Sequence, residues 1–122
     1  SRSIMVCVTH QKTCDRLISH GIKLNEELNV PLYVVHCVQK GRNFLGNPYE
    51  GEALEYLFTA AQLAGGELTL LRREDVDDAL ADFAKRHEIG VIVMGSSPGQ
   101  VGESIITRLQ RRLPDVKFEI LG

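Results

Sequence analysis

The sequence predicts an α/β domain built on a doubly wound parallel sheet of five strands, with helices on both faces. Five short apolar runs alternate with four amphipathic stretches, as expected of a series of βαβ units. Several of the runs are apolar at consecutive positions, which is typical of strands covered on both faces. The 122 residues suit one domain spanning 1–122, and 43% apolar with 25% charged residues is an ordinary globular balance.

The strands follow from these runs. We expect buried strands at residues 4–8, 32–38 and 91–94, a short third strand at 67–71 and a last strand at 116–121. The crossovers between parallel strands are expected to be right-handed. Gly90 is the residue expected to release the chain into the fourth strand.

The helices follow from caps, breakers and helical spacing. Thr13 is the expected N-cap of the first helix, Asp75 caps the third, and residues 103–113 form the fourth. The expected core faces are Leu17, Gly21, Leu24 and Leu28 in the first helix, Leu54, Leu57, Phe58, Ala61 and Ala64 in the second, and Val76, Ala79, Leu80, Phe83 and Ala84 in the third. Pro31 and the pair Gly65-Gly66 end the first two helices.

In a doubly wound sheet, ligands bind beyond the carboxyl ends of the strands, where the winding reverses. If the fourth strand lies on the other side of the first, two loops meet at that point. They are the loop Thr9-His10-Gln11 and the loop at residues 95–102. We expect any ligand site there, with Val38 at the end of the neighbouring strand.

The second of these loops could hold an anion. It follows a buried strand and opens a helix, so its free N–H groups and the helix N-terminus would favour negative charge. Its candidate residues are Met94, Gly95, Ser96, Ser97, Gly99, Gly102 and Ser104. It matches neither a Walker loop nor the dinucleotide fingerprint. An ordinary loop, whose glycines serve turns and packing, explains the residues equally well.

Other chemistry has weaker support. The histidines and cysteines show no metal-ligand spacing, so no metal site is expected, and the acidic run Glu74-Asp75-Asp77-Asp78 is interpreted as a helix start. His36, in a buried run, is interpreted as a core histidine. No nucleophile elbow or paired acid and base is present, so an enzyme is not expected.

Charge and hydropathy constrain partners and location. The net charge of −2 gives no general attraction to nucleic acid or anionic membrane, and no apolar run is long enough to span a bilayer. The basic cluster Arg108, Arg111 and Arg112 is interpreted as structural. Three cysteines, an odd number without a CxxC pair, indicate a reduced cytoplasmic setting. The absence of an initial methionine fits either a trimmed chain or a domain cut from a larger protein.

The order of elements and the segment Val91-Ile-Val-Met-Gly-Ser-Ser97 resemble the universal stress protein superfamily over essentially the whole chain. Residues 4–8, 75–84 and 108–114 look closer to the stress-protein-like domain of KdpD-type sensor histidine kinases, which respond to potassium limitation and osmotic stress. The resemblance implies the strand order 3-2-1-4-5. In the ATP-binding members it also implies a nucleotide at the point where the winding reverses.

The loops depart from the pattern of those ATP-binding members, which carry an Asp after the first strand and a G-x2-G-x9-G-[S/T] loop after the fourth. Here Thr9 stands at the Asp position, Gly99 comes one residue late, and most of the nine-residue spacer before Gly102 is missing. Glu103 displaces Ser104 from the expected Gly-Ser pair. A shortened loop offers a triphosphate fewer N–H donors, although a smaller anion could still fit.

Three functions remain open from the sequence. The first is a regulatory domain of a KdpD-like cytoplasmic sensor that binds ATP or another adenine nucleotide and contacts neighbouring sensor-kinase domains. The second is a ligand-free module for homodimerisation, through the strand at 116–121, or for docking to proteins. The third is an enzyme acting on an adenylated substrate, although the HxGH and SGGxDS signatures of such enzymes are absent.

Overall fold

The computed structural model describes residues 2–8, 14–63 apart from 40–47, 65–95 apart from 74, and 100–122. Five strands and four helices alternate along these residues. The strands are β1 (Ser3–Val8), β2 (Leu32–Gln39), β3 (Glu67–Arg73), β4 (Ile89–Gly95) and β5 (Lys117–Leu121). The helices are α1 (Cys14–Leu28), α2 (Pro48–Leu63), α3 (Val76–Arg86) and α4 (Gln100–Arg112). None of the described helices is long and apolar enough to cross a membrane.

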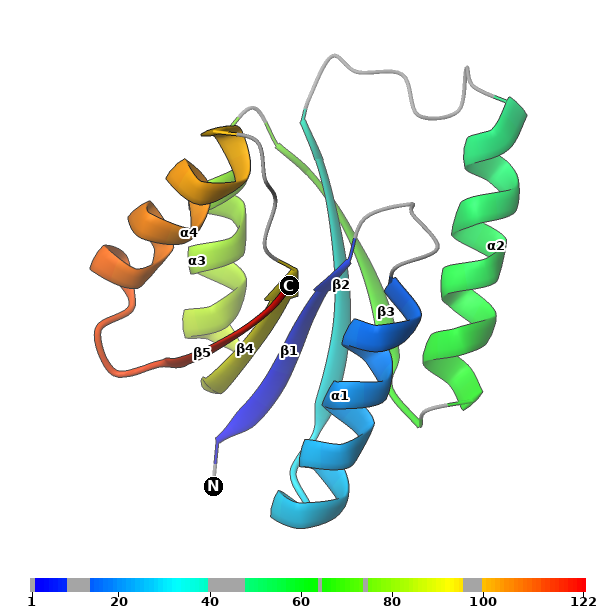
Figure 1. Cartoon of the computed structure of the whole chain (residues 1–122), viewed down its shortest axis with the longest axis horizontal. Helices are drawn as coiled ribbons and strands as arrows, with labels where there is room; N and C mark the ends of the chain where they lie inside the picture. The colour runs from blue at the N-terminus through cyan, green and yellow to red at the C-terminus, as the bar shows by residue number, and fades with distance from the viewer. Residues whose placement is uncertain (1, 9–13, 40–47, 64, 74, 96–99) are drawn as a thin grey trace.

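All four strand pairs are parallel, and the strand order is β3-β2-β1-β4-β5. This confirms the predicted doubly wound sheet and the order 3-2-1-4-5. The chain winds outward from β1 to β3 on one side, and it then returns to place β4 on the other side of β1. The winding therefore reverses between β1 and β4 (Figure 1).

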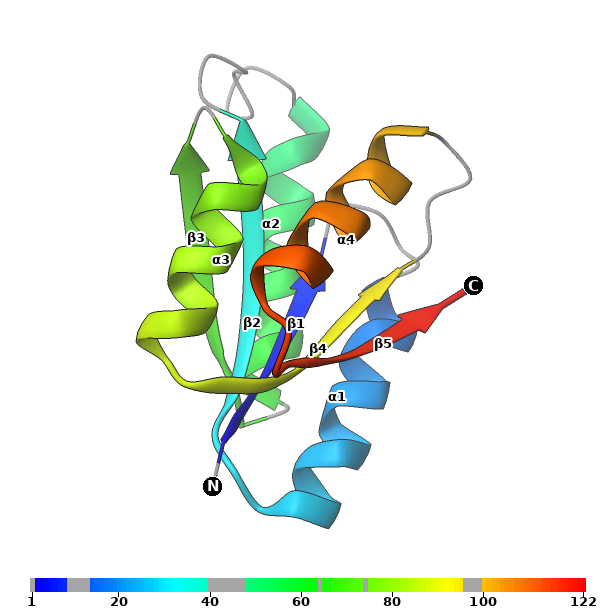
Figure 2. The ribbon, with the colours of Figure 1, turned by 90° about the vertical axis from the view of Figure 1, so that its left-hand side faces the viewer.

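The sheet separates two apolar layers, as the two orthogonal views show (Figures 1 and 2). On one face, α1 packs on side chains such as Val6, Val34 and Val93, which are fully buried. On the other face, α3 and α4 cover Met5 and Ile92, which are also fully buried, as is Leu109 of α4. Because β1 and β4 contribute alternate residues to both layers, their sequences are apolar at consecutive positions.

Gly21 allows α1 to approach the sheet closely. A Cβ atom at this position would lie 2.5 Å from Cγ2 of Val6 and 3.3 Å from Cδ1 of Leu32. No real Cβ contact is that short, so only glycine fits at this crossing of helix and strand. The sequence predicted Gly21 in the core face of the helix. The structure shows that a larger residue there would collide with Val6.

Several predicted boundaries shift. Asn29, with φ of 52°, ends α1 before Pro31, and Glu88, with φ of 51°, makes the turn before β4. Gly90 lies inside β4, and the prediction that it releases the chain into that strand is wrong. Helix α4 begins at Gln100, three residues earlier than expected. The sequence did not predict this first turn of α4, because glycine and serine are common in loops but also occur in the first turn of helices.

Two residues expected in the core are exposed. Leu28, at the last position of α1, is 49% exposed, and Phe58 on α2 is 51% exposed. Both lie at core spacing along their helices. However, Leu28 lies at the helix end, and α2 buries Ala61 instead. Asp75 occupies the N-cap of α3 in an extended conformation, but its side chain makes no capping hydrogen bond.

Candidate functional site

The carboxyl ends of β1 and β4 form the point where the winding reverses. The two strands pair in parallel, and Val6 lies opposite Val93. Val8 ends β1, and Met94 and Gly95 end β4, so these residues lie together at the same edge of the sheet. The structure thus places two predicted site residues, Met94 and Gly95, at the end of β4 beside β1.

Among its described neighbours, Gly95 has room for a Cβ atom. Met94 is largely buried in the layer beneath α3 and α4, whereas Gly95 is exposed. A Cβ atom on Gly95 would meet only the methyl groups of Leu17, at 3.7 and 3.9 Å, which is ordinary van der Waals contact. The described neighbours therefore do not require glycine at position 95.

A buried histidine fixes the end of β1. His36 on β2 is 5% exposed, and its Nδ1 lies 2.9 Å from the carbonyl oxygen of Val8. Because a carbonyl oxygen only accepts, Nδ1 must carry the proton and donate it. This bond holds the last residue of β1 against β2, which agrees with the interpretation of His36 as a core histidine. It also positions the backbone that leads into the candidate site.

The remaining predicted site residues are described in part or not at all. Thr9, His10, Gln11, Ser96, Ser97 and Gly99 lie outside the described residues. Val38 lies on β2, and Gly102 and Ser104 lie on α4, but their side chains are not among those described. The prediction that Gly102 belongs to the loop is wrong, because α4 already includes it. The N–H groups of a first helical turn have no partner within the helix, and such groups can bind an anion.

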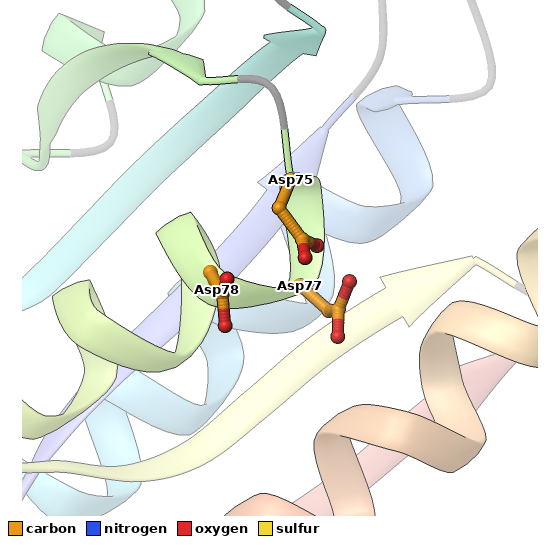
Figure 3. Close-up of side chains that lie close together, drawn as sticks. All are labelled: Asp75, Asp77 and Asp78. Atoms are coloured by element: carbon orange, nitrogen blue, oxygen red, sulfur yellow. The ribbon is translucent and has the colours of Figure 1, made fainter.

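The acidic run at the start of α3 brings three carboxylates together (Figure 3). Ligand oxygens of Asp75, Asp77 and Asp78 all lie within 4.8 Å of one another. However, Asp77 lies 3.4 Å from Nε of Arg108 and 3.8 Å from a guanidinium nitrogen of Arg112, which also donates a hydrogen bond to Asp78. That hydrogen bond raises the pKa of Arg112 above its ordinary value.

These ion pairs join α3 to α4. They agree with the structural interpretation of Arg108 and Arg112. They also neutralise two of the three carboxylates, those of Asp77 and Asp78. The contact between the two helices therefore accounts for the cluster. A cation would have to displace the arginines from Asp77 and Asp78.

Sequence reasoning missed a second basic group, on α1. Arg16, His20 and Lys23 line one hollow beside β5, and Nε2 of His20 lies 3.0 Å from a carboxylate oxygen of Glu119. Their spacing of four and three residues puts them on one helix face, which is the signal that could have found them. The partner Glu119 is distant in sequence, so only the fold reveals the pair.

The fold and the edge between β1 and β4 define the class of protein: a doubly wound α/β domain with its candidate ligand site at the reversal of the winding. The model of the universal stress protein family matches residues 1–113, and the chain belongs to that family. No curated protein sequence matches it significantly.

Solved structures of the family share this fold. A universal stress protein from Archaeoglobus fulgidus in complex with dAMP is 22% identical, with a TM-score of 0.75, and the match covers 100% of this chain and 98% of that one. A family member from Burkholderia pseudomallei is 21% identical, with a TM-score of 0.71 and coverage of 98% and 94%. A universal stress protein in complex with cAMP is 15% identical, with a TM-score of 0.70 and coverage of 99% and 97%.

Proposed function

We propose that this domain is regulatory rather than catalytic, and that it binds an adenine nucleotide at the edge between β1 and β4. The observation that carries the proposal is the position of Gly95. This exposed glycine ends β4 beside the end of β1, and none of its described neighbours requires the absence of a side chain. Doubly wound sheets bind ligands at this edge, and two proteins of the same fold are named for complexes with dAMP and cAMP.

The site favours a nucleoside monophosphate over ATP. The loop after β4 is short, since α4 begins at Gln100 and only four residues separate it from Gly95. Such a loop offers fewer N–H donors than a longer one, which favours a ligand with one phosphate group at the start of α4 over a triphosphate. The ligands named for the two similar structures, dAMP and cAMP, each carry a single phosphate.

The wider role belongs to the same proposal. The resemblance of residues 4–8, 75–84 and 108–114 to KdpD-type kinases supports a cytoplasmic sensor of potassium limitation or osmotic stress. In such a sensor this domain would pass the nucleotide signal to neighbouring sensor-kinase domains. Its β5 edge is also open to a second copy, because β5 pairs only with β4 among the described residues.

A thermal-shift titration with AMP, dAMP, cAMP, ADP and ATP tests the binding. A ligand at a hundred times its Kd adds about 2.7 kcal/mol, or roughly 10 °C in Tm for a domain of this size. We expect a saturable rise with a monophosphate and a smaller one with ATP. Gly95→Val should abolish the rise and lower the Tm without ligand only slightly, because a Cβ atom at this position meets only ordinary van der Waals contacts and valine suits a strand.

Thr59→Val, on the exposed part of α2, is the matched control and should keep the full rise. No rise with any nucleotide, together with a dimer mass by size exclusion, would overturn the proposal in favour of a ligand-free homodimerisation or docking module. An unchanged rise in Gly95→Val would place the nucleotide elsewhere.

A further inference from the structure

β3 is one of the two edge strands of the sheet. Among the described residues it pairs only with β2, so one side of its backbone has no partner strand in this part of the chain. Figure 1 shows α2 along this end of the sheet, which is the opposite end from β5. An edge strand of this kind can pair with a strand of another chain, and the sheet then continues from one molecule into the other.

Exposed apolar side chains gather on β3 and on α2, the helix that precedes it. Leu70, the middle residue of β3, is 49% exposed, and Phe58 and Leu63 on α2 are more exposed still. Leu68 packs in the layer that contains Ala61 of α2, so Leu70, two residues further along the strand, points to the same face. This end of the sheet therefore presents apolar surface for a partner to bury.

The sequence of β3 is complementary to itself when two copies run antiparallel. The strand begins with Glu67, has Leu70 at its centre and ends with Arg73. In the antiparallel register that pairs all seven residues, Leu70 lies opposite Leu70 of the other copy, and each Glu67 lies opposite an Arg73. Opposite charges at facing positions stabilise a strand pair. A twofold-symmetric interface requires such a self-complementary surface.

The other edge of the sheet lacks this self-complementarity. β5 has five residues, and the antiparallel register that pairs all of them places Glu119 opposite Glu119 of the other copy. Like charges at facing positions destabilise a strand pair. Glu119 also has partners within its own chain, His20 at 3.0 Å and Lys117 at 3.6 Å. Of the two edges, β3 is therefore the one suited to a second copy.

We propose that two copies of this chain associate through β3, in an antiparallel pair that joins their sheets across a twofold axis at Leu70. The axis is perpendicular to the joined sheet, so both α2 helices lie on the same face and their exposed apolar side chains can be buried against the other copy. Because β2 separates β3 from β1, the dimer leaves the edge between β1 and β4 free for the proposed nucleotide.

Analytical ultracentrifugation of the chain over a wide range of concentrations tests the dimer. We expect a monomer–dimer equilibrium in the unaltered chain and a monomer in Leu70→Lys, because two lysines would face each other on the axis. Ile120→Lys, at an exposed apolar position of the opposite edge, is the matched control and should keep the dimer. Because Leu70 is exposed, thermal unfolding should show that Leu70→Lys still folds.

An exchange of charges tests the register without altering Leu70. Glu67→Arg places two arginines opposite each other at both ends of the strand pair, and Arg73→Glu places two glutamates there. Each single variant should raise the Kd of its own dimer roughly five- to thirtyfold. An equimolar mixture of the two variants should dimerise like the unaltered chain, because every facing pair then has opposite charges.

The contrary results are distinct. A monomer at every concentration would overturn the proposal, and so would a dimer that persists in Leu70→Lys. Loss of the dimer in Ile120→Lys would assign the interface to β5 instead. A mixture of the two charge variants that dimerises no better than either alone would refute the antiparallel β3 pair. None of these results depends on nucleotide binding, so the titration of Gly95→Val remains an independent test.

Discussion

His36 links the core to the candidate site at the scale of a single residue. Its position within an apolar run suggested a buried histidine, but the run could not identify the atom to which the ring bonds. The structure supplies that atom, the carbonyl oxygen of Val8, across the pair formed by β1 and β2. A polar side chain 5% exposed is tolerated here because its proton has an acceptor.

We expect His36→Phe to lower the free energy of unfolding by about 1–3 kcal/mol, because it removes the donor to a buried carbonyl. His36→Asn, whose amide can donate near the position of Nδ1, should recover part of this loss. Urea denaturation monitored by circular dichroism measures both variants. Equal losses in the two variants would show that ring packing, rather than the hydrogen bond to Val8, accounts for the effect.

The contact between α3 and α4 shows how two elements use charge at their boundary. Leu80 and Leu109 pack together in the apolar layer, and the acidic start of α3 meets the basic end of α4. The two aspartates differ in exposure: the side chain of Asp77 is 11% exposed and that of Asp78 is 49% exposed. The helix dipole explains the sign of each charge cluster from the sequence alone. The sequence does not show that the two clusters face each other.

We expect Asp77→Asn to lower the free energy of unfolding by about 1–2 kcal/mol, because it removes the charge of a largely buried partner of Arg108. Asp78→Asn, at a more exposed position, should cost clearly less. The pair of variants keeps side-chain size constant, and thermal or urea unfolding compares them. If Asp78→Asn proves the more costly variant, the buried carboxylate does not anchor α4.

At the scale of the whole molecule, the sequence predicts the fold well and the site only in part. Apolar runs such as residues 4–8 and 91–94 alternate with helical periodicity, and that local pattern is enough for a parallel sheet. The place of the candidate site follows from topology, which brings Gly95 to the end of β1. The contact between His20 and Glu119 could not be predicted, because it joins α1 to β5 across 99 positions of the sequence.

Chemical-shift mapping of the ¹⁵N-labelled protein with AMP tests the central claim most directly. We predict saturable shifts of the amides of Val8, Met94 and Gly95, at the edge between β1 and β4, and little change at Gly66, Lys85 or Lys117. These three controls lie before β3, late in α3 and at the start of β5. Saturable shifts confined to residues far from Val8 and Gly95, or no shifts with AMP, dAMP or ATP, would contradict the account.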